Sequence, residues 1–189
     1  GIKSISSMIK ERDTNGKFKN IIDFMSRVNS EVINKRQLEK LIQSGAFDSV
    51  ELDRSKLFNN VTKFVELFGG EKIFNQDMLF EERVISFEDK NLFKQKTQKW
   101  NNLKILTNEL EVIGFYFSDH PLNYYPKKFL HAHNINFFAE NFNNQNINSL
   151  RVCGSILDVK ERSNKAGKKY AFITVSEVDT QFELSIFSE

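Results

Sequence analysis

The spacing of apolar residues changes along this chain, and that change limits the folds open to it. Over residues 5–68 and 92–113, apolar side chains recur three or four positions apart, as on one face of a helix. From residue 150 onward, Val, Ile and Phe alternate in part with polar residues, which is typical of strands. We therefore expect an α+β multidomain chain, in which a mainly helical part is followed by a small sheet.

The helical part contains clear start and stop signals. Asn34 stands three residues before Gln37, a capping-box arrangement, and predicts a helix that ends at Ser44 and Gly45. Asp53 is the predicted N-cap of the next helix, whose apolar face carries Leu57, Val61, Phe64, Val65 and Phe68.

The two helices with the glycine turn between them form a helix, glycine hairpin, helix unit. Backbone N–H groups of such a hairpin can bind a phosphate oxygen without contacting a base. The alternative is that Gly45 is only a C-cap within a helical core. Neighbouring Lys35, Arg36, Lys40 and Arg54 favour the DNA interpretation, although cations on exposed helix faces are usually only solvated.

Composition excludes some classes of protein. The chain has 189 residues, 40% of them hydrophobic, which is enough for a real core. It has no apolar run of membrane-spanning length and no signal-peptide pattern, so we expect a cytoplasmic protein. Cys153 has no second cysteine with which to pair. The chain starts at Gly1 and ends just after a strand-like run, so we expect a piece of a longer protein.

Five consecutive residues have the form of a short docking peptide: Gln76, Asp77, Met78, Leu79 and Phe80. A glutamine amide followed by two adjacent apolar side chains suits a deep apolar pocket ringed by polar groups. Glycines at 69 and 70 precede this peptide and acidic residues flank it, so we expect a loop that avoids phosphates and is free for a protein partner. The alternative is that Met78, Leu79 and Phe80 are core residues.

The most basic stretch of the chain follows the first of three predicted strands, 150–159, 169–175 and 181–187. Cations beside exposed rings suit a single nucleic-acid strand, because they attract its phosphates while its bases stack on the rings. The alternative is that the rings pack inward beside a solvated hairpin. The candidate single-strand-binding residues are Lys160, Arg162, Lys165, Lys168, Lys169, Tyr170 and Phe172.

The middle of the chain offers no catalytic or metal-binding pattern. Residues 89–113 predict one long amphipathic helix that includes Trp100 and ends at Gly114. His120 precedes a proline and is expected to be a packing residue, and His131 and His133 lack further zinc ligands at suitable spacing. Residues 136–149 are expected to form an irregular connection. We expect no metal site and no nucleotide transfer, because no carboxylates are held together on strands.

Residues 34–48 (Asn-Lys-Arg-Gln-Leu-Glu-Lys-Leu-Ile-Gln-Ser-Gly-Ala-Phe-Asp) resemble a segment of the bacterial replicative DNA polymerase III alpha subunit. Residues 8–12 and 15–18 are similar to the helix that follows the first of that family's tandem helix-hairpin-helix motifs. The glycine pattern of that first hairpin would fall at and before Gly1. Residues 109–122 are similar to the link between the family's clamp-binding region and its next domain.

The resemblance implies three parts. Residues 1–88 would be a tandem helix-hairpin-helix region with an internal sliding-clamp motif at 76–80, and residues 89–149 a long helix and connection. Residues 150–189 would begin an OB-fold, which stays incomplete because that barrel usually has five strands. The implied duplex DNA contacts are Gly1, Lys3, Lys35, Arg36, Ser44 and Gly45.

The resemblance also implies how the docking peptide and the sheet act. Gln76 would occupy a polar subsite of the clamp, and Leu79 and Phe80 its apolar groove. Asp77 and Met78 depart from the commoner order, in which the acidic residue comes third. The OB-fold part would contact single-stranded template.

The implied function is that of a non-catalytic fragment of a DNA-directed DNA polymerase. Its partners would be duplex and single-stranded DNA, the sliding clamp (the beta subunit) and other replisome subunits, with no membrane. No cofactor is expected in the fragment, whereas Mg²⁺ is expected at the palm of the parent enzyme. Two alternatives stay open: a stand-alone nucleic-acid-binding module, such as a repair or recombination factor, and a purely structural spacer between domains.

Overall fold

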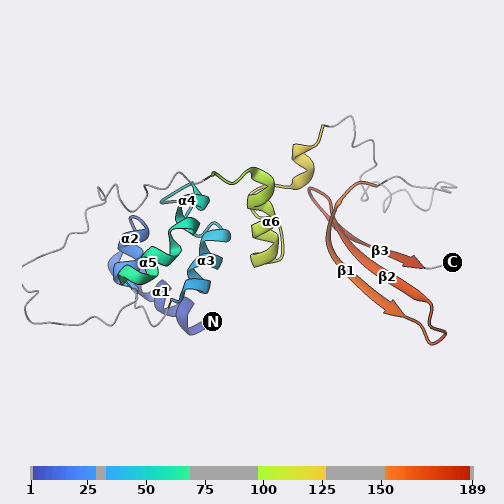
Figure 1. Ribbon diagram of the computed structural model, residues 1–189, viewed down its shortest axis with the longest axis horizontal. Helices are drawn as coiled ribbons and strands as arrows, with labels where there is room; N and C mark the ends of the chain where they lie inside the picture. Colours follow the sequence, from blue (N-terminus) through green and yellow to red (C-terminus); the bar gives the residue numbers. More distant parts are fainter. Residues whose placement is uncertain (1, 29–32, 69–97, 127–151, 188–189) are drawn as a thin grey trace, which may run out of the picture. The chain divides into compact units, whose positions relative to one another are not determined.

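The computed structural model describes residues 2–28, 33–68, 98–126 and 152–187 (Figure 1). The chain divides into two compact units, Gly1–Val112 and Ile113–Glu189. The first unit is helical and the second contains an antiparallel three-stranded sheet, which confirms the expected α+β class. The expected domain boundaries near residues 88 and 149 lie outside the described residues. No helix in the described ranges is long and apolar enough to cross a membrane.

Two helices begin the first unit, α1 (Ile2–Asn15) and the shorter α2 (Ile21–Arg27). Helix α1 ends at Gly16, whose φ of 84° lies in the left-handed region that glycine adopts without a steric cost. Arg27 joins the two helices, because its guanidinium donates to Glu11 Oε1 at 3.0 Å and to the Gly16 carbonyl oxygen at 2.8 Å. The pKa of Arg27 is raised, chiefly by the hydrogen bond to Glu11.

Helix α3 (Lys35–Gln43) has the predicted capping box. The Asn34 side chain accepts a hydrogen bond from the Gln37 N–H at 2.9 Å, and the Gln37 side chain accepts one from the Asn34 N–H at 2.9 Å. The helix ends at the predicted place, with Ser44 as C-cap and Gly45 at φ 82°. Local side-chain chemistry therefore sets both ends of this helix.

The segment predicted as one helix from Asp53 to Phe68 is instead two, α4 (Arg54–Asn59) and α5 (Val61–Phe68). The N-cap prediction is confirmed, since the Asp53 side chain accepts from the Lys56 N–H. The prediction of one continuous helix is wrong because of Asn60. Its N–H and its side-chain amide both donate hydrogen bonds to carbonyl groups of α4. An asparagine side chain competes with the backbone for such partners, which ends the helix there.

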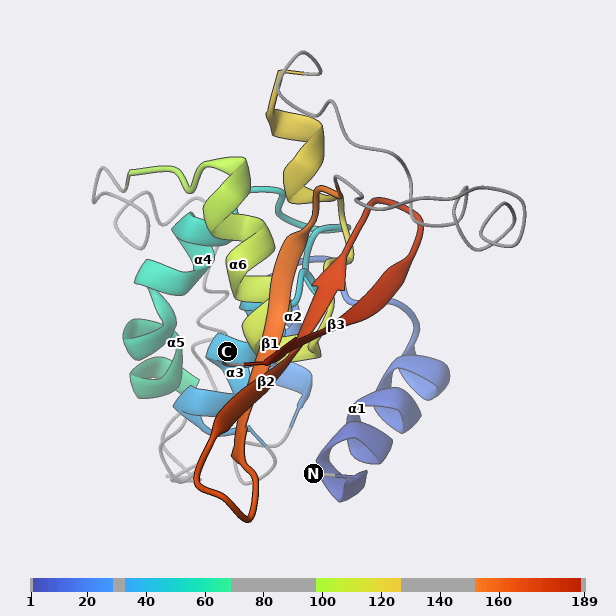
Figure 2. The same cartoon turned by 90° about the vertical axis from the view of Figure 1, so that its right-hand side faces the viewer.

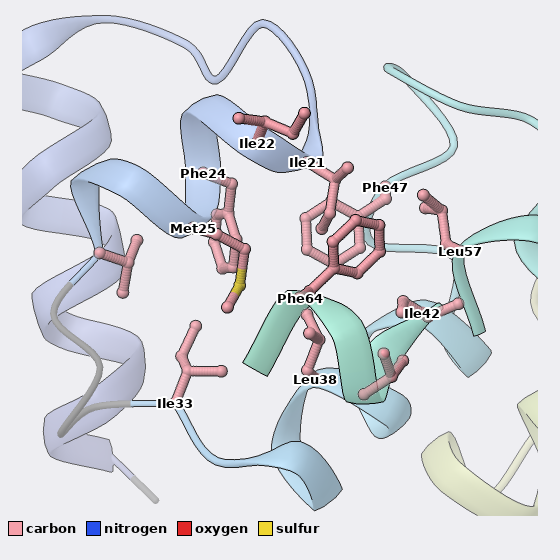
Figure 3. Packing of buried hydrophobic residues seen from close by; sticks show 12 residues of the cluster. Ile21, Ile22, Phe24, Met25, Ile33, Leu38, Ile42, Phe47, Leu57 and Phe64 are labelled. Atoms are coloured by element: carbon pink, nitrogen blue, oxygen red, sulfur yellow. The ribbon is translucent and has the colours of Figure 1, made fainter. Parts of the chain in front are cut away.

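The break at Asn60 allows both short helices to bury their apolar faces in one core (Figure 3). Leu57 from α4 and Phe64 from α5 lie in this core together with Leu38 and Ile42 from α3. Phe24 of α2 meets Phe47 of the α3–α4 turn edge to face, with ring centroids 4.9 Å apart. Interlocked apolar side chains of this kind are the main stabilising term of a small helical unit.

Arg54 connects this core to a helix distant in sequence, α6 (Asn102–Ile113). Its guanidinium is buried, donates to both carboxylate oxygens of Asp48 at 2.8 and 2.6 Å, and donates to Glu109 of α6 at 2.8 Å. It also donates to the Gln43 carbonyl oxygen at the end of α3. A single side chain therefore joins α3, the turn after it, α4 and α6.

Helix α6 begins later than predicted. Residues 98–101 are not helical, and Asn101 accepts a hydrogen bond from the Lys104 N–H at 2.8 Å, which starts the helix at Asn102. The expectation that Trp100 lies in the helix is wrong, because its ring packs against Phe58 at 5.2 Å between centroids. The helix ends at Gly114 as predicted.

The second unit contains the strands β1 (Ser155–Ser163), β2 (Lys169–Ser176) and β3 (Gln181–Phe187). Both pairings are antiparallel, and β2 lies between the other two strands (Figure 2). Strand β1 has a register shift between Ile156 and Asp158. It also extends to Ser163, so the first half of the predicted basic loop belongs to the strand.

His120, at the start of the 3₁₀ helix η2 (Pro121–Tyr124), is buried and hydrogen-bonded through both ring nitrogens. Nδ1 accepts from the Leu122 N–H at 3.2 Å, which places the ring proton on Nε2, 3.1 Å from Ser176 Oγ. The Ser176 hydroxyl donates in turn to the Glu177 carbonyl oxygen at 3.0 Å. The neutral ring thus holds the segment before η2 against the end of β2, as expected of a packing residue.

Replacing Gly45 by alanine is expected to destabilise the helical unit by roughly 3–5 kcal/mol. The alanine would have to adopt a left-handed backbone conformation. Its Cβ would also collide with the Arg54 guanidinium and lie only 2.8 Å from Asp48 Oδ2. Gly16→Ala is the matched control, because Gly16 has a similar φ of 84° and no atom within 4 Å of its Cβ position. It is expected to cost about 1–2 kcal/mol. Urea unfolding measures both, and equal losses would show that Arg54 tolerates displacement.

The stability of the second unit is expected to fall as the pH drops below about 6.5. Burial lowers the pKa of His120 below its usual 6.5, while the charges of Asp119 and Asp179 act in the opposite direction. The unfolded chain therefore takes up a proton before the folded unit does, and the loss continues until the lowered pKa is passed. Thermal melts between about pH 7.5 and 5.5 measure this slope. In His120→Gln the part of the slope that is due to this residue should vanish, and identical slopes in both proteins would contradict the assignment.

Candidate nucleic-acid interface

One face of the sheet combines aromatic rings with cations. The register places Tyr170 between Arg162 and Phe187, and Phe172 between Lys160 and Ser185. Side chains of directly paired residues point to the same face of an antiparallel sheet. Tyr170 meets Phe172 edge to face at 5.6 Å between centroids and stacks on Phe187 at 6.0 Å. Three rings and two cations therefore lie next to one another, with Lys160 and Arg162 exposed.

A tight turn carries the further cations Lys165 and Lys168 beyond the ends of β1 and β2. The Asn164 side chain accepts hydrogen bonds from the N–H groups of Ala166 and Lys168 at 2.9 and 3.0 Å. Gly167 adopts φ 78°, which completes the turn. Lys169 pairs with Ser163 and so lies on the opposite face from Tyr170. Of the predicted cations, Lys160 and Arg162 share the face of the rings, and Lys165 and Lys168 lie in the adjoining turn.

The opposite face of the sheet is mainly apolar, although Glu161 and Lys169 also lie on it. Val159, Ile173 and Leu184 form one cross-strand row, and Ala171 and Ile186 form the next. Several of these side chains are exposed within the open sheet. The strong difference between the two faces means that Tyr170 and Phe172 lie on the polar side.

Sequence reasoning missed Phe187, whose ring stacks on Tyr170. Strand alternation alone predicts that Phe187 shares a face with Ser185 and Glu183, but it does not say which face of the sheet that is. Assigning it to the face of Tyr170 requires the register between β2 and β3, which is a tertiary property.

In the helical unit, Lys35 and Arg36 occupy the exposed first turn of α3, and Lys3 is exposed on α1. Gly1 lies outside the described residues. Ser44 and Gly45 form the turn at the other end of α3, which leads through residues 44–53 into α4.

The backbone donors of this turn have internal partners. The N–H groups of Ser44, Gly45 and Ala46 donate to carbonyl oxygens of Lys40, Ile42 and Leu41 at 3.0 to 3.1 Å. Gly45 therefore follows the C-cap Ser44 in a left-handed conformation that closes the end of α3, which is the structural role weighed from the sequence as the alternative. Two cations counted in favour of DNA have internal roles as well, since Arg54 is buried and Lys40 pairs with Glu111 at 3.0 Å.

The predicted docking peptide, Gln76, Asp77, Met78, Leu79 and Phe80, lies outside the described residues, as do His131 and His133. Within the residues that the structure describes, no three His, Cys, Asp or Glu side chains are grouped so that they could hold a metal ion.

Comparison with known proteins gives two findings. Residues 1–57 match the family described as helix-hairpin-helix motif. The whole chain is also similar to proteins named DNA polymerase III subunit alpha. The protein from Caulobacter vibrioides is 25% identical over 97% of this chain and 16% of its own length. The protein from Buchnera aphidicola is 29% identical over 100% of this chain and 16% of its own length. The protein from Rickettsia bellii is 32% identical over 95% of this chain and 15% of its own length.

The chain thus spans 15 to 16% of the length of these relatives. Helices α1 to α3, the turn after α3 and the start of α4 fall within the matched helix-hairpin-helix region, and the similarity to the polymerase subunits continues through the sheet. Similarity over the full chain to relatives that share one name, together with the motif match, shows that the chain belongs to the DNA polymerase III alpha subunit family, of which it represents one segment.

Proposed function

We propose that this chain is a non-catalytic part of a bacterial replicative DNA polymerase and that it holds DNA and the sliding clamp near the polymerase in the cytoplasm. The observation that carries the proposal is the cluster of Tyr170, Phe172 and Phe187 beside Lys160 and Arg162 on one face of the sheet. The family relationship makes DNA the expected ligand of that face.

The sheet face suits a single strand rather than a duplex. Bases in a duplex are stacked on each other, whereas an unpaired base can place its ring on Tyr170 or Phe187. The adjoining Lys160, Arg162 and Lys165 are then positioned for phosphates on either side. Neither interaction depends on base identity, so binding would be sequence-independent and sensitive to salt.

The helix-hairpin-helix unit is proposed to bind the phosphate backbone of duplex DNA. Exposed Lys3, Lys35 and Arg36 are available for phosphates, and Ser44 and Gly45 form the turn that approaches them. Because three N–H groups of this turn already have internal partners, side-chain cations would supply most of this affinity. Gly1 completes the set proposed from the sequence.

The peptide Gln76–Phe80 is proposed to bind the sliding clamp. Tethering to the clamp would make each return of the polymerase to the primer end an intramolecular event, so a motif of modest affinity is sufficient. The parent enzyme would carry out nucleotide transfer with Mg²⁺ at a separate site.

Replacing Tyr170 or Phe172 by alanine is expected to weaken binding of an oligo(dT) single strand by roughly 5- to 100-fold, because one stacked base is lost. Fluorescence anisotropy at fixed salt measures the affinity. Val159→Ala is the matched control, since Val159 lies on the opposite face of the neighbouring strand and should leave binding unchanged. Equal effects of the ring variants and this control would overturn the proposed single-strand site.

The triple variant Gln76→Ala, Leu79→Ala and Phe80→Ala is expected to lose at least about thirtyfold in affinity for the sliding clamp, because an amide contact and two apolar anchors are removed. Surface plasmon resonance on immobilised clamp measures this loss. Asp77→Asn keeps all three anchors and serves as the control. If the triple variant binds as well as the unaltered chain, the peptide is not the clamp motif, and a stand-alone nucleic-acid-binding module becomes the better description.

A further inference from the structure

A cleft of about 580 Å³ lies in the second unit, away from the basic turn between β1 and β2. Its lining includes Phe115, Tyr116 and Phe117 and the turn between β2 and β3. Its charged lining residues, Asp119, Glu177 and Asp179, are all acidic. This combination of rings and carboxylates is unlike the opposite end of the sheet.

The aromatic wall is fixed in place by two polar contacts with the sheet. The Tyr116 hydroxyl lies 2.8 Å from Ser155 Oγ at the start of β1, and His120 Nε2 lies 3.1 Å from Ser176 Oγ at the end of β2. The Tyr116 and His120 rings also meet edge to face at 5.3 Å. Phe115 and Phe117, the neighbours of Tyr116, remain 46% and 69% exposed. A fixed segment thus presents two phenyl rings at the cleft.

The carboxylate of Asp119 is also held in position. Its Oδ1 accepts from Asn123 Nδ2 at 2.6 Å and from the His120 N–H at 2.7 Å. The hydrogen bond from Asn123, followed by those from Tyr124 and the His120 backbone, lowers the pKa of Asp119. Asp119 is therefore an oriented anion at neutral pH, and Asp179, in the turn between β2 and β3, adds a second exposed carboxylate to the lining.

We propose that this cleft binds an arginine or lysine side chain from a basic segment of a partner protein. The aliphatic stem of such a side chain would pack on Phe115 and Phe117, its cation would lie over a ring face, and its N–H groups would donate to Asp119 and Asp179. A ligand therefore needs both an aliphatic stem, which packs on the rings, and a cationic head group, which pairs with the carboxylates.

Charge complementarity selects a basic protein segment over nucleic acid as the occupant. Phosphates would be repelled by the three carboxylates, whereas the opposite end of the sheet carries Lys160, Arg162, Lys165 and Lys168. The sheet therefore has a basic end for an anionic ligand and an acidic end for a cationic one. Both ends could be occupied together, because their lining residues do not overlap.

The test uses the full chain and a fluorescein-labelled peptide of alternating arginine and leucine, with a matched peptide in which glutamine replaces each arginine. Fluorescence anisotropy is expected to show binding of the arginine peptide alone, weakened by added salt. Phe117→Ala should weaken it roughly fivefold, and Asp179→Lys roughly tenfold, while Phe117→Tyr should restore it. Lys160→Gln is the matched control and should leave peptide binding unchanged.

Equal binding of the two peptides would overturn the proposal, because the cleft would then be only an apolar surface. So would arginine-peptide binding that Phe117→Ala and Asp179→Lys both leave unchanged. Thermal melts of each variant establish that the second unit is folded. Oligo(dT) binding is measured in parallel and should be unaffected by Phe117→Ala, so failure of the single-strand site and failure of the peptide site are distinguishable.

Discussion

The buried guanidinium of Arg54 holds the helical unit in its observed arrangement. Its partners come from three places in the sequence: the carbonyl of Gln43, the carboxylate of Asp48 and the carboxylate of Glu109. The hydrogen bond to Asp48, followed by that to Glu109, raises the pKa of Arg54, so the group stays charged despite its burial. Removing one member of such a buried set costs about 3–5 kcal/mol, since a charge is then left without a partner. The turn after α3 consequently has one shape, and only glycine fits at position 45 beside the guanidinium.

That constraint changes how the helix-hairpin-helix unit is understood. The glycine turn is a structural junction whose N–H groups satisfy the end of α3, so the phosphate binding proposed for this unit would depend on exposed cations near the start of that helix. Lys35 and Arg36 project from a helix whose two ends are both capped. A well-ordered helix positions its cations at little further entropic cost, which suits a surface that tracks a backbone without recognising sequence.

The two faces of the sheet differ in side-chain chemistry, and so do its two ends. Alternation along each strand separates the rings and cations of one face from the apolar rows of the other. Along the strands, the turn between β1 and β2 gathers lysines, whereas the turn between β2 and β3 lies next to Asp119 and the His120 network. The opposite charges at the two ends are the basis of the two proposals, which would place a nucleic-acid ligand at one end of this small unit and a basic protein segment at the other.

The sequence by itself determined the features that depend on neighbours along the chain. It predicted the α+β class, the Asn34 capping box, the stop at Gly45, the Asp53 N-cap and the three strands. Each rests on hydrogen bonds or side-chain periods within a few residues. It failed at the break at Asn60 and at the start of α6, where core packing and a local cap override the apolar period.

Only the tertiary structure decided which side chains meet across long separations in sequence. The burial of Arg54 by Glu109, the stacking of Phe187 on Tyr170 and the acidic cleft at Phe117 all join residues from different elements. Composition shows that these residue types are present, but their charge and exposure in the folded chain depend on the partners that packing brings to them. The physical reason is that desolvation and ion pairing act through space, whereas capping and alternation act along the chain.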